Sequence, residues 1–149
     1  MSKINKGTPW PLGSNITTRG VNFSIAAPQA SYIELLIFKN ATDRNPKEII
    51  RLGEHHRSGN YWHVEVEGLG AGCFYGYRVI NSENEAKDFI KSEKILLDPC
   101  ARAISGWELY DRNSYLKQNI SSSNSLKAVV CERDQFDFYN HPRPKHPWN

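Results

Sequence analysis

The sequence predicts an all-β domain, a β-sandwich that is followed by a long irregular C-terminal segment. Five runs of strand-like residues occur before residue 81, and turn-forming residues separate each run from the next. Short strands at this spacing are typical of β-sandwiches. The length of 149 residues suits a single domain and is too short for a (β/α)8 barrel, which needs about 250 residues.

The first three strands follow from the hydrophobic pattern. Residues 21–25 alternate apolar and polar side chains, which is the period of a half-buried strand. Residues 32–38 are apolar apart from Glu34, which favours a central strand that is covered on both faces. Residues 48–52 form a shorter apolar run after a polar, turn-rich segment.

The clearest alternation lies at residues 62–67. Its two faces are predicted to be Trp62, Val64 and Val66 toward the core, and His63, Glu65 and Glu67 toward solvent. Glycines within residues 68–72 then allow a flexible turn, and an aromatic-rich strand follows at residues 74–80.

The second half of the chain is less regular. Residues 94–104 contain an extended apolar segment, Leu96-Leu97-Asp98-Pro99, that ends at the proline. Residues 127–130 are the last candidate strand. Three prolines within residues 141–147 indicate a linker. We therefore divide the chain into an N-terminal extended segment at 1–13, the sandwich at 14–105, and an irregular segment and linker at 106–149.

Charge and cysteine content argue against several classes of protein. The 19 Lys and Arg and 16 Asp and Glu give a net charge of +3 without a basic cluster, which argues against nucleic-acid binding. Cys73, Cys100 and Cys131 are odd in number and widely spaced, as expected for free thiols in the cytoplasm. No signal peptide and no membrane span of about 20 apolar residues is recognisable.

No catalytic or metal-binding pattern stands out. His55 and His56 are adjacent, so they would diverge on a strand, and no cysteine lies at zinc spacing from them. Glu65 and Glu67 could act as paired glycosidase carboxylates, but the strand pattern favours a solvated outer face. We therefore predict no catalysis, no metal and no cofactor for this chain.

The aromatic content makes carbohydrate binding a candidate function. Aromatic rings stack on the C–H faces of sugars, and the chain has four Trp and seven Tyr. Trp62, Tyr75 and Tyr77 have strand periodicity and are assigned to the core. The Trp residues in loop-like segments, and hence the better candidates for an exposed surface, are Trp10, Trp107 and Trp148.

Several motifs in chain order resemble one family. They are Gly-Thr-Pro-Trp-Pro-Leu-Gly at residues 7–13, the strands at 20–24 and 33–38, the hairpin at 68–79, Leu-Leu-Asp-Pro-Cys-Ala-Arg-Ala-Ile at 96–104, Phe-Asp-Phe at 136–138 and Pro147-Trp148. The chain resembles the N-terminal module of isoamylase-type glycogen debranching enzymes, with Trp10 and Cys100 where the family usually has Tyr. This resemblance implies an immunoglobulin-like sandwich of about seven strands that precedes an α-amylase-type barrel, which hydrolyses α-1,6 branch points.

The resemblance also implies a non-catalytic role, with the catalytic carboxylates outside this chain. The module would pack on the downstream catalytic barrel and shape its glucan groove. The alternative is an autonomous module that binds α-glucan and tethers the polymer to the enzyme. Related modules that bind glycogen well carry Trp and Lys at the sheet's binding face. Here Lys39 has no Trp near it, and Gly76 stands where a Lys is expected, so weak glucan binding is predicted.

Two sets of candidate site residues result. The candidates for glucan contact are Trp10, Trp107 and Phe89. The candidates for docking on the barrel are Leu96, Leu97, Asp98, Pro99, Ile104 and Trp148. Residues 96–104 are more apolar than a peripheral loop needs, and the proline-rich tail restricts how far a following domain can move.

Overall fold

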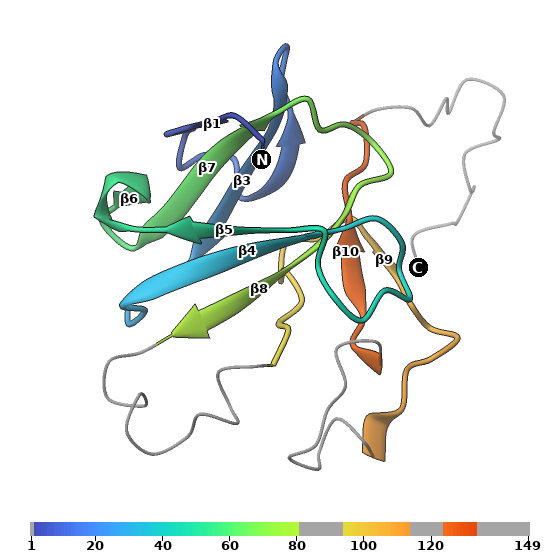
Figure 1. Cartoon of the computed structure of the whole chain (residues 1–149). Helices are drawn as coiled ribbons and strands as arrows, with labels where there is room; N and C mark the ends of the chain where they lie inside the picture. The colour runs from blue at the N-terminus through green and yellow to red at the C-terminus, as the bar shows by residue number, and fades with distance from the viewer. Residues whose placement is uncertain (1, 81–93, 114–123, 134–149) are drawn as a thin grey trace, which may run out of the picture.

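The computed structural model describes residues 2–80, 94–113 and 124–133, which form two antiparallel sheets (Figure 1). Sheet A contains β1 (Ile4–Asn5), β2 (Gly13–Ile16), β3 (Gly20–Ala26), β6 (Arg57–Ser58) and β7 (Tyr61–Glu67). Its order is β1-β7-β3-β2, with β6 also paired to β7. Sheet B contains β4 (Tyr32–Phe38), β5 (Glu48–Leu52), β8 (Phe74–Ile80), β9 (Ala103–Ser105) and β10 (Lys127–Val129). Its order is β5-β4-β8-β10-β9.

The predicted all-β sandwich is confirmed, as are its five early strands and the strand that begins at Lys127. The strands that the sequence did not predict are β1, β2, β6 and β9, which have two to four residues each. Such short segments show no usable alternation, and pairing with longer strands defines them. Both β1 and β10 pair with the sheets, although they lie outside the range 14–105 assigned to the sandwich.

The core lies between the two sheets. Trp62, Val64 and Val66 of β7 are fully buried there, as predicted. The ring of Tyr75 packs edge-on against Phe23 of the opposite sheet, with ring centroids 4.9 Å apart. The Trp62 indole Nε1 donates a hydrogen bond to the Ala27 carbonyl at 3.0 Å, so its one polar atom is satisfied inside the core.

The prediction that the outer face of β7 is solvated is wrong. His63 is 1% exposed and Glu65 is 5% exposed. Residues 2–11, hereafter the N-terminal strap, pair with the edge of β7 through β1 and then pass over this face, where Gly7 lies against the backbone of β7. His63 Nδ1 is 2.8 Å from the Lys6 carbonyl, which requires the proton on Nδ1, and its Nε2 lies 2.8 Å from the Ser58 hydroxyl. Alternation identifies a polar face but cannot distinguish water from a polar segment of the same chain as its cover.

The outer face of sheet B is also covered in part. Leu36 and Phe38 point away from the core between the sheets, yet they are buried, because Ile95 packs with them in a second apolar cluster. A Cβ atom at Gly76 would lie 2.6 Å from the Ile95 Cγ2 atom. Glycine at this position therefore lets the segment that begins at residue 94 lie directly on β8.

Candidate functional site

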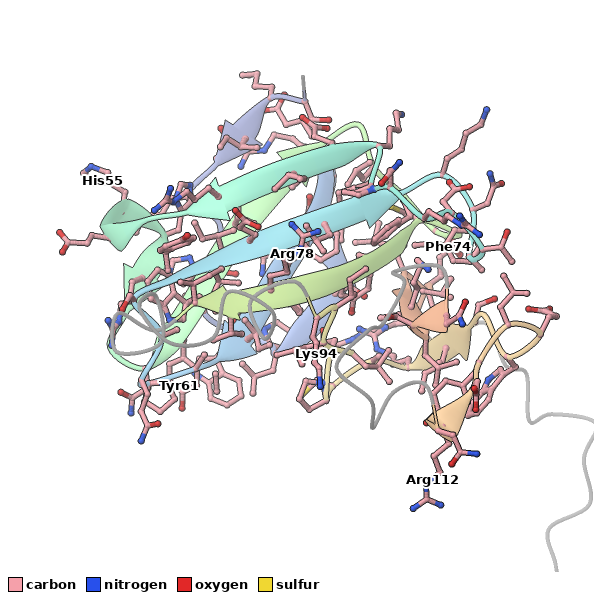
Figure 2. All side chains as sticks on the ribbon, turned by 60° about the horizontal axis from the view of Figure 1, so that its bottom comes forward. His55, Tyr61, Phe74, Arg78, Lys94 and Arg112 are labelled. Atoms are coloured by element: carbon pink, nitrogen blue, oxygen red, sulfur yellow. The ribbon has the colours of Figure 1, made fainter. Side chains whose placement is uncertain are left out.

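The two Trp residues proposed for glucan contact are both exposed in the structure. Trp10 is 60% exposed and Trp107 is 61% exposed, as the sequence predicted for loop positions. Trp10 contacts Tyr61, whereas Trp107 contacts Tyr110. Tyr61 and Arg112 lie far apart on the molecule (Figure 2), so the two Trp residues belong to separate surfaces. The remaining glucan candidate, Phe89, lies outside the described residues.

Trp10 and Tyr61 form a tilted aromatic pair. Their ring centroids are 5.4 Å apart and their planes make an angle of 54°. Trp10 comes from the N-terminal strap and Tyr61 from the first position of β7, so sequence spacing gave no sign of this pair. An exposed aromatic pair of this kind can stack on the C–H face of a sugar ring.

Polar side chains on β3 hold the strap that presents Trp10. Asn22 is buried, and its amide makes two hydrogen bonds with the backbone of Thr8, one from Thr8 N at 2.8 Å and one to Thr8 O at 3.0 Å. The buried Ser24 hydroxyl donates to the Pro9 carbonyl at 2.7 Å. Gly7 has a φ of +70°, and a Cβ atom there would clash with the Asn22 side chain. Trp10 therefore projects from a fixed backbone.

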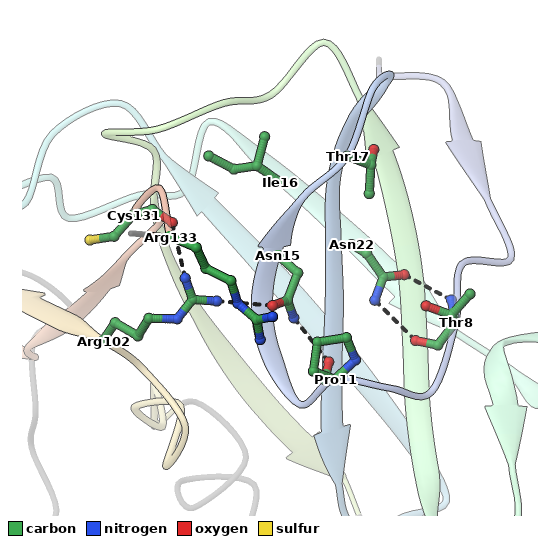
Figure 3. Close-up of a pocket in the computed structure, with 9 residues that line it drawn as sticks. All are labelled: Thr8, Pro11, Asn15, Ile16, Thr17, Asn22, Arg102, Cys131 and Arg133. Carbon is green, nitrogen blue, oxygen red and sulfur yellow. Dashed lines mark hydrogen bonds between the residues drawn. The ribbon is translucent and has the colours of Figure 1, made fainter. Parts of the chain in front are cut away.

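Beside the strap is an open pocket of about 290 Å³ (Figure 3). Its lining residues come from the strap, sheet A and the segments around β9 and β10: Thr8, Pro11, Asn15, Ile16, Thr17, Asn22, Arg102, Cys131 and Arg133. Arg102 is held by three acceptors. Its Nη2 donates to Ser14 O and Asn15 Oδ1, both at 2.9 Å, and its Nη1 donates to Cys131 O at 3.3 Å.

Among the described residues that line the pocket, two carry guanidinium groups and none carries a carboxylate. The nearby Glu65 is already occupied, since it accepts a hydrogen bond from Thr17 Oγ1 at 2.8 Å and an ion pair from Arg19 at 2.7 Å. The hydrogen bond from Thr17, with smaller contributions from Asn5 and Arg19, lowers the pKa of Glu65. The pocket is thus a neutral-to-basic surface of amide, hydroxyl and guanidinium groups.

The sequence signalled Trp10 but not the pocket. Asn15, Arg102 and Arg133 have no motif or periodicity that joins them, and the fold alone brings them together. The apolar run at residues 96–104 gave a partial signal for the pocket, because Arg102 is the one charged residue in it besides Asp98.

The docking candidates face different directions. Asp98 is buried, where it accepts hydrogen bonds from the Tyr75 hydroxyl at 2.7 Å and from the Cys100 amide at 2.8 Å. Burial raises the pKa of Asp98. Leu97 packs against the main core, and the Leu96 backbone pairs with Tyr77. Much of the apolar character of this segment therefore stabilises the module itself.

Other docking candidates remain accessible. Pro99 and Ile104 are exposed, and two further exposed apolar residues, Trp107 and Leu109, follow Ile104 closely. β9 carries Ile104 and is one of the two edge strands of sheet B in the described part of the chain. Trp148 lies outside the described residues.

The remaining outer face of sheet B carries charged and aromatic side chains that contact each other. Arg51 stacks 3.6 Å above the centre of the Tyr32 ring. Arg78, which is labelled in Figure 2, pairs with Glu34 at 3.3 Å. Within residues 2–80, 94–113 and 124–133, no three His, Cys, Asp or Glu side chains are grouped as a metal site. In the same ranges, no helix has the length and apolarity needed to span a membrane.

Comparison with known proteins identifies sequence relatives along the whole chain. The model of a family described as carbohydrate-binding module 48 (isoamylase N-terminal domain) matches residues 11–101. The glycogen debranching enzyme of Dickeya chrysanthemi is 31% identical over 100% of this chain and 22% of its own length. That of Serratia proteamaculans is 32% identical over 99% of this chain and 22% of its own length. The chain thus spans about a fifth of these relatives.

Solved structures share the fold. A group B streptococcal pullulanase in complex with maltotetraose superposes with a TM-score of 0.59 at 16% identity, covering 84% of this chain and 15% of the pullulanase. The glycogen-degrading pneumococcal virulence factor SpuA gives a TM-score of 0.58 at 14% identity, covering 85% of this chain and 12% of that protein. At these identities the likeness concerns the fold alone.

Proposed function

Because this chain belongs to the carbohydrate-binding module 48 family, whose members are non-catalytic domains, we propose that it is the N-terminal module of an α-1,6-glucan debranching enzyme. In this role it packs on the catalytic barrel of the same polypeptide and shapes the groove that receives glucan. A cytoplasmic location and an isoamylase-type parent are further parts of this proposal.

The observation that carries the docking role is the closed outer face of sheet B. Ile95 occupies the space above Gly76 and buries Leu36 and Phe38, so this part of the sheet is not free to receive a polymer. The aromatic and charged residues that remain on that face are engaged with each other, Arg51 with Tyr32 and Arg78 with Glu34. A structural role in a larger enzyme fits a module whose sheet surface is occupied in this way.

The surface best suited to docking begins at the edge strand β9. Ile104, Trp107 and Leu109 are exposed and lie within six consecutive residues. Exposed apolar residues that gather in one place mark interaction surfaces more often than isolated ones do. Relatives of this module carry it as about a fifth of a longer chain, which supplies a partner that is always present.

Hydrogen exchange tests the docking role. The chain alone is compared with the same chain joined to its downstream catalytic domain, and exchange at residues 103–109 should slow in the longer protein. Leu109→Ser should weaken this protection. Ile49→Ser is the matched control, because Ile49 is 44% exposed and Leu109 is 43% exposed, and it should have no effect. Equal exchange at residues 103–109 in the two proteins contradicts the proposal.

The second candidate function is an autonomous glucan-binding module, which the exposed Trp10 favours. Glycogen affinity electrophoresis of the chain alone separates the two functions. The docking role predicts little retardation. Strong retardation that Trp10→Ala or Trp107→Ala abolishes, with unchanged exchange at residues 103–109, would establish the tethering function instead.

A further inference from the structure

Lys127, the first residue of β10, is fully buried, although its side chain ends in a charged group. Its ammonium donates hydrogen bonds to the carbonyls of Ala41 at 2.7 Å and of Ser125 at 3.3 Å. The same ammonium lies 4.8 Å from the centre of the Phe38 ring. Burying a charge costs free energy that such partners offset. The ammonium thus joins the backbone at Ala41 to the backbone at Ser125 in the interior of the domain.

The Ala41 carbonyl belongs to the loop between β4 and β5, residues 39–47, which lies beside β10 (Figure 1). Asp43 closes a turn within this β4–β5 loop, because its carboxylate accepts hydrogen bonds from the Asn40 backbone N–H at 2.8 Å and from the Asn40 side-chain amide at 3.2 Å. Burial lowers the pKa of Lys127, and the negative charge of Asp43 acts in the opposite direction. The loop therefore has a turn of its own, and Lys127 fixes where that turn lies on the domain.

The segment proposed for docking, residues 103–109, meets the same two carbonyls at Gly106. A Cβ atom on Gly106 would lie 3.5 Å from the Ser125 carbonyl oxygen and 3.6 Å from the Ala41 carbonyl oxygen. Gly106 is buried and has a φ of +102°, a backbone conformation that glycine adopts readily. The carbonyls that accept hydrogen bonds from Lys127 therefore also lie against Gly106.

Gly106 in turn fixes the exposed part of the docking segment. The Leu109 N–H donates to the Gly106 carbonyl, and the Tyr110 N–H donates to the Trp107 carbonyl, both at 3.3 Å. The rings of Trp107 and Tyr110 pack edge-on, with centroids 5.7 Å apart. These turns leave Trp107 and Leu109 exposed to solvent. A shift of Gly106 would therefore move both exposed side chains.

The β4–β5 loop has the composition of an interface rim. Interfaces between proteins have an apolar centre with aromatic side chains, and a polar rim that water reaches. Trp107 and Leu109 supply an apolar centre, and the loop lies against the same segment at Gly106. The exposed residues next to Ala41 are polar, namely Lys39, Asn40 and Thr42.

From this geometry we infer that Lys127 is the positioning residue of the docking surface, and that residues 40–43 form the polar rim of that surface. The buried ammonium holds the β4–β5 loop and Gly106 in one arrangement, so the downstream catalytic domain contacts the loop and the exposed apolar side chains together. The inference rests on the proposed function for the identity of the partner. It adds a second part to the docking surface and identifies the residue that joins the two parts.

Hydrogen exchange in the 149-residue chain, without any partner, tests the positioning role. Lys127→Met keeps a long unbranched side chain but removes the charge and the donors. Exchange at residues 40–43 and at residues 106–110 should accelerate together, by about tenfold or more. Exchange in β3 and β7 of sheet A should stay unchanged, which reports an intact fold. Lys39→Met, the same change at an exposed position of the loop, is the matched control and should alter neither segment.

A second variant separates the effect of the ammonium from that of packing. Lys127→Arg keeps a positive charge and can donate hydrogen bonds to two carbonyls. Exchange at residues 40–43 and 106–110 should therefore stay within about threefold of its rate in the unsubstituted chain. A role in packing alone predicts that folded Lys127→Met and Lys127→Arg lose protection equally, and that result overturns the inference.

The chain joined to its downstream catalytic domain tests the rim. Exchange at residues 40–43 should slow together with exchange at residues 103–109, and Lys127→Met should reduce both protections by about tenfold. The measurement on the unsubstituted protein requires no variant, so it tests the rim even where a Lys127 variant does not fold.

Further outcomes overturn the inference. One is unchanged exchange at both segments in folded Lys127→Met, and another is acceleration at only one of them. Protection of residues 103–109 without protection of residues 40–43 in the longer protein removes the rim and leaves the docking role standing. If the longer protein protects neither segment, the docking role fails and the rim fails with it, whereas exchange in the 149-residue chain still decides whether Lys127 holds the two segments together.

Discussion

The outer faces of the two sheets are both covered by the chain itself, but by opposite kinds of contact. On sheet A the N-terminal strap is held by buried polar side chains that bond to its backbone, as Asn22 and His63 do. On sheet B the cover is apolar: Ile95 rests on Gly76 and packs in one cluster with Leu36 and Phe38.

The difference has functional consequences. The polar cover fixes the backbone of the strap while leaving Trp10 in solvent, because hydrogen bonds to the backbone do not require its side chains. The apolar cover works only by burying side chains, so it closes the surface that it occupies. One face therefore presents an aromatic ring, and the other is removed from contact with ligands.

The largest loss of stability is expected for a substitution in the core between the two sheets. Trp62 lies on the inner face of β7, opposite the strap, and Trp62→Ala should destabilise the domain by about 3–5 kcal/mol. Thermal or denaturant unfolding measures this loss. Trp107→Ala, a change of the same residue type at an exposed position, should alter stability by less than about 0.5 kcal/mol. An unchanged melting temperature for Trp62→Ala would mean that the inner face is misassigned.

The apolar cover is tested at Gly76. Gly76→Ala introduces a Cβ atom that must displace Ile95, which should cost about 1–3 kcal/mol. Made in an Ile95→Ala background, where the contacting Cγ2 atom is absent, the same change should cost clearly less. Equal losses in the two backgrounds, measured by a double-mutant cycle, would show that Ile95 does not rest on Gly76.

The polar cover is tested at Asn22, with a smaller expected effect. Asn22→Ala removes both bonds to Thr8, but Thr8 is exposed and water replaces part of what is lost. We expect a loss of about 0.5–1.5 kcal/mol and faster hydrogen exchange in the strap. Asn22→Asp keeps the acceptor for Thr8 N and removes only the donor. Its loss of stability should therefore lie between those of the unsubstituted chain and of Asn22→Ala. A strap that exchanges normally in Asn22→Ala would contradict its anchoring by this amide.

The smallest expected effect is the dependence of the strap's stability on pH. Because the folded pKa of Glu65 is lowered by its hydrogen bonds, its contribution to stability is present above its unfolded pKa of about 4.3 and is lost as the pH falls through the folded pKa. Exchange at residues 3–8 should therefore accelerate relative to the core below about pH 4. Glu65→Gln should weaken this pH dependence, while Glu108→Gln should leave it intact. Identical acid responses of the strap and the core would argue that Glu65 does not hold the strap.

The strands and the core were predictable because they depend on local patterns. The alternation of Trp62, Val64 and Val66 identified the inner face of β7, and the near-continuous apolar run at residues 32–38 identified a strand that is covered on both sides. The exposure of Trp10 followed from its position outside any such pattern. The pocket beside the strap was not predictable, because Asn15 and Arg102, which line it, are 87 residues apart in the chain.

The sequence by itself determined the fold class, the inward face of β7 and the membership of a family, since all of these are encoded in residues close together or in motifs in fixed order. Only the tertiary structure decided what covers the two outer faces. A polar residue such as Glu65 shows the same sequence pattern whether water satisfies it or other parts of the chain do, here Thr17 and Asn5 of the strap. A glycine such as Gly76 likewise shows the same pattern whether it marks a turn or makes room for Ile95. Hydrogen-bonding capacity and empty space are local properties, but the partner that fills them comes from a distant part of the chain.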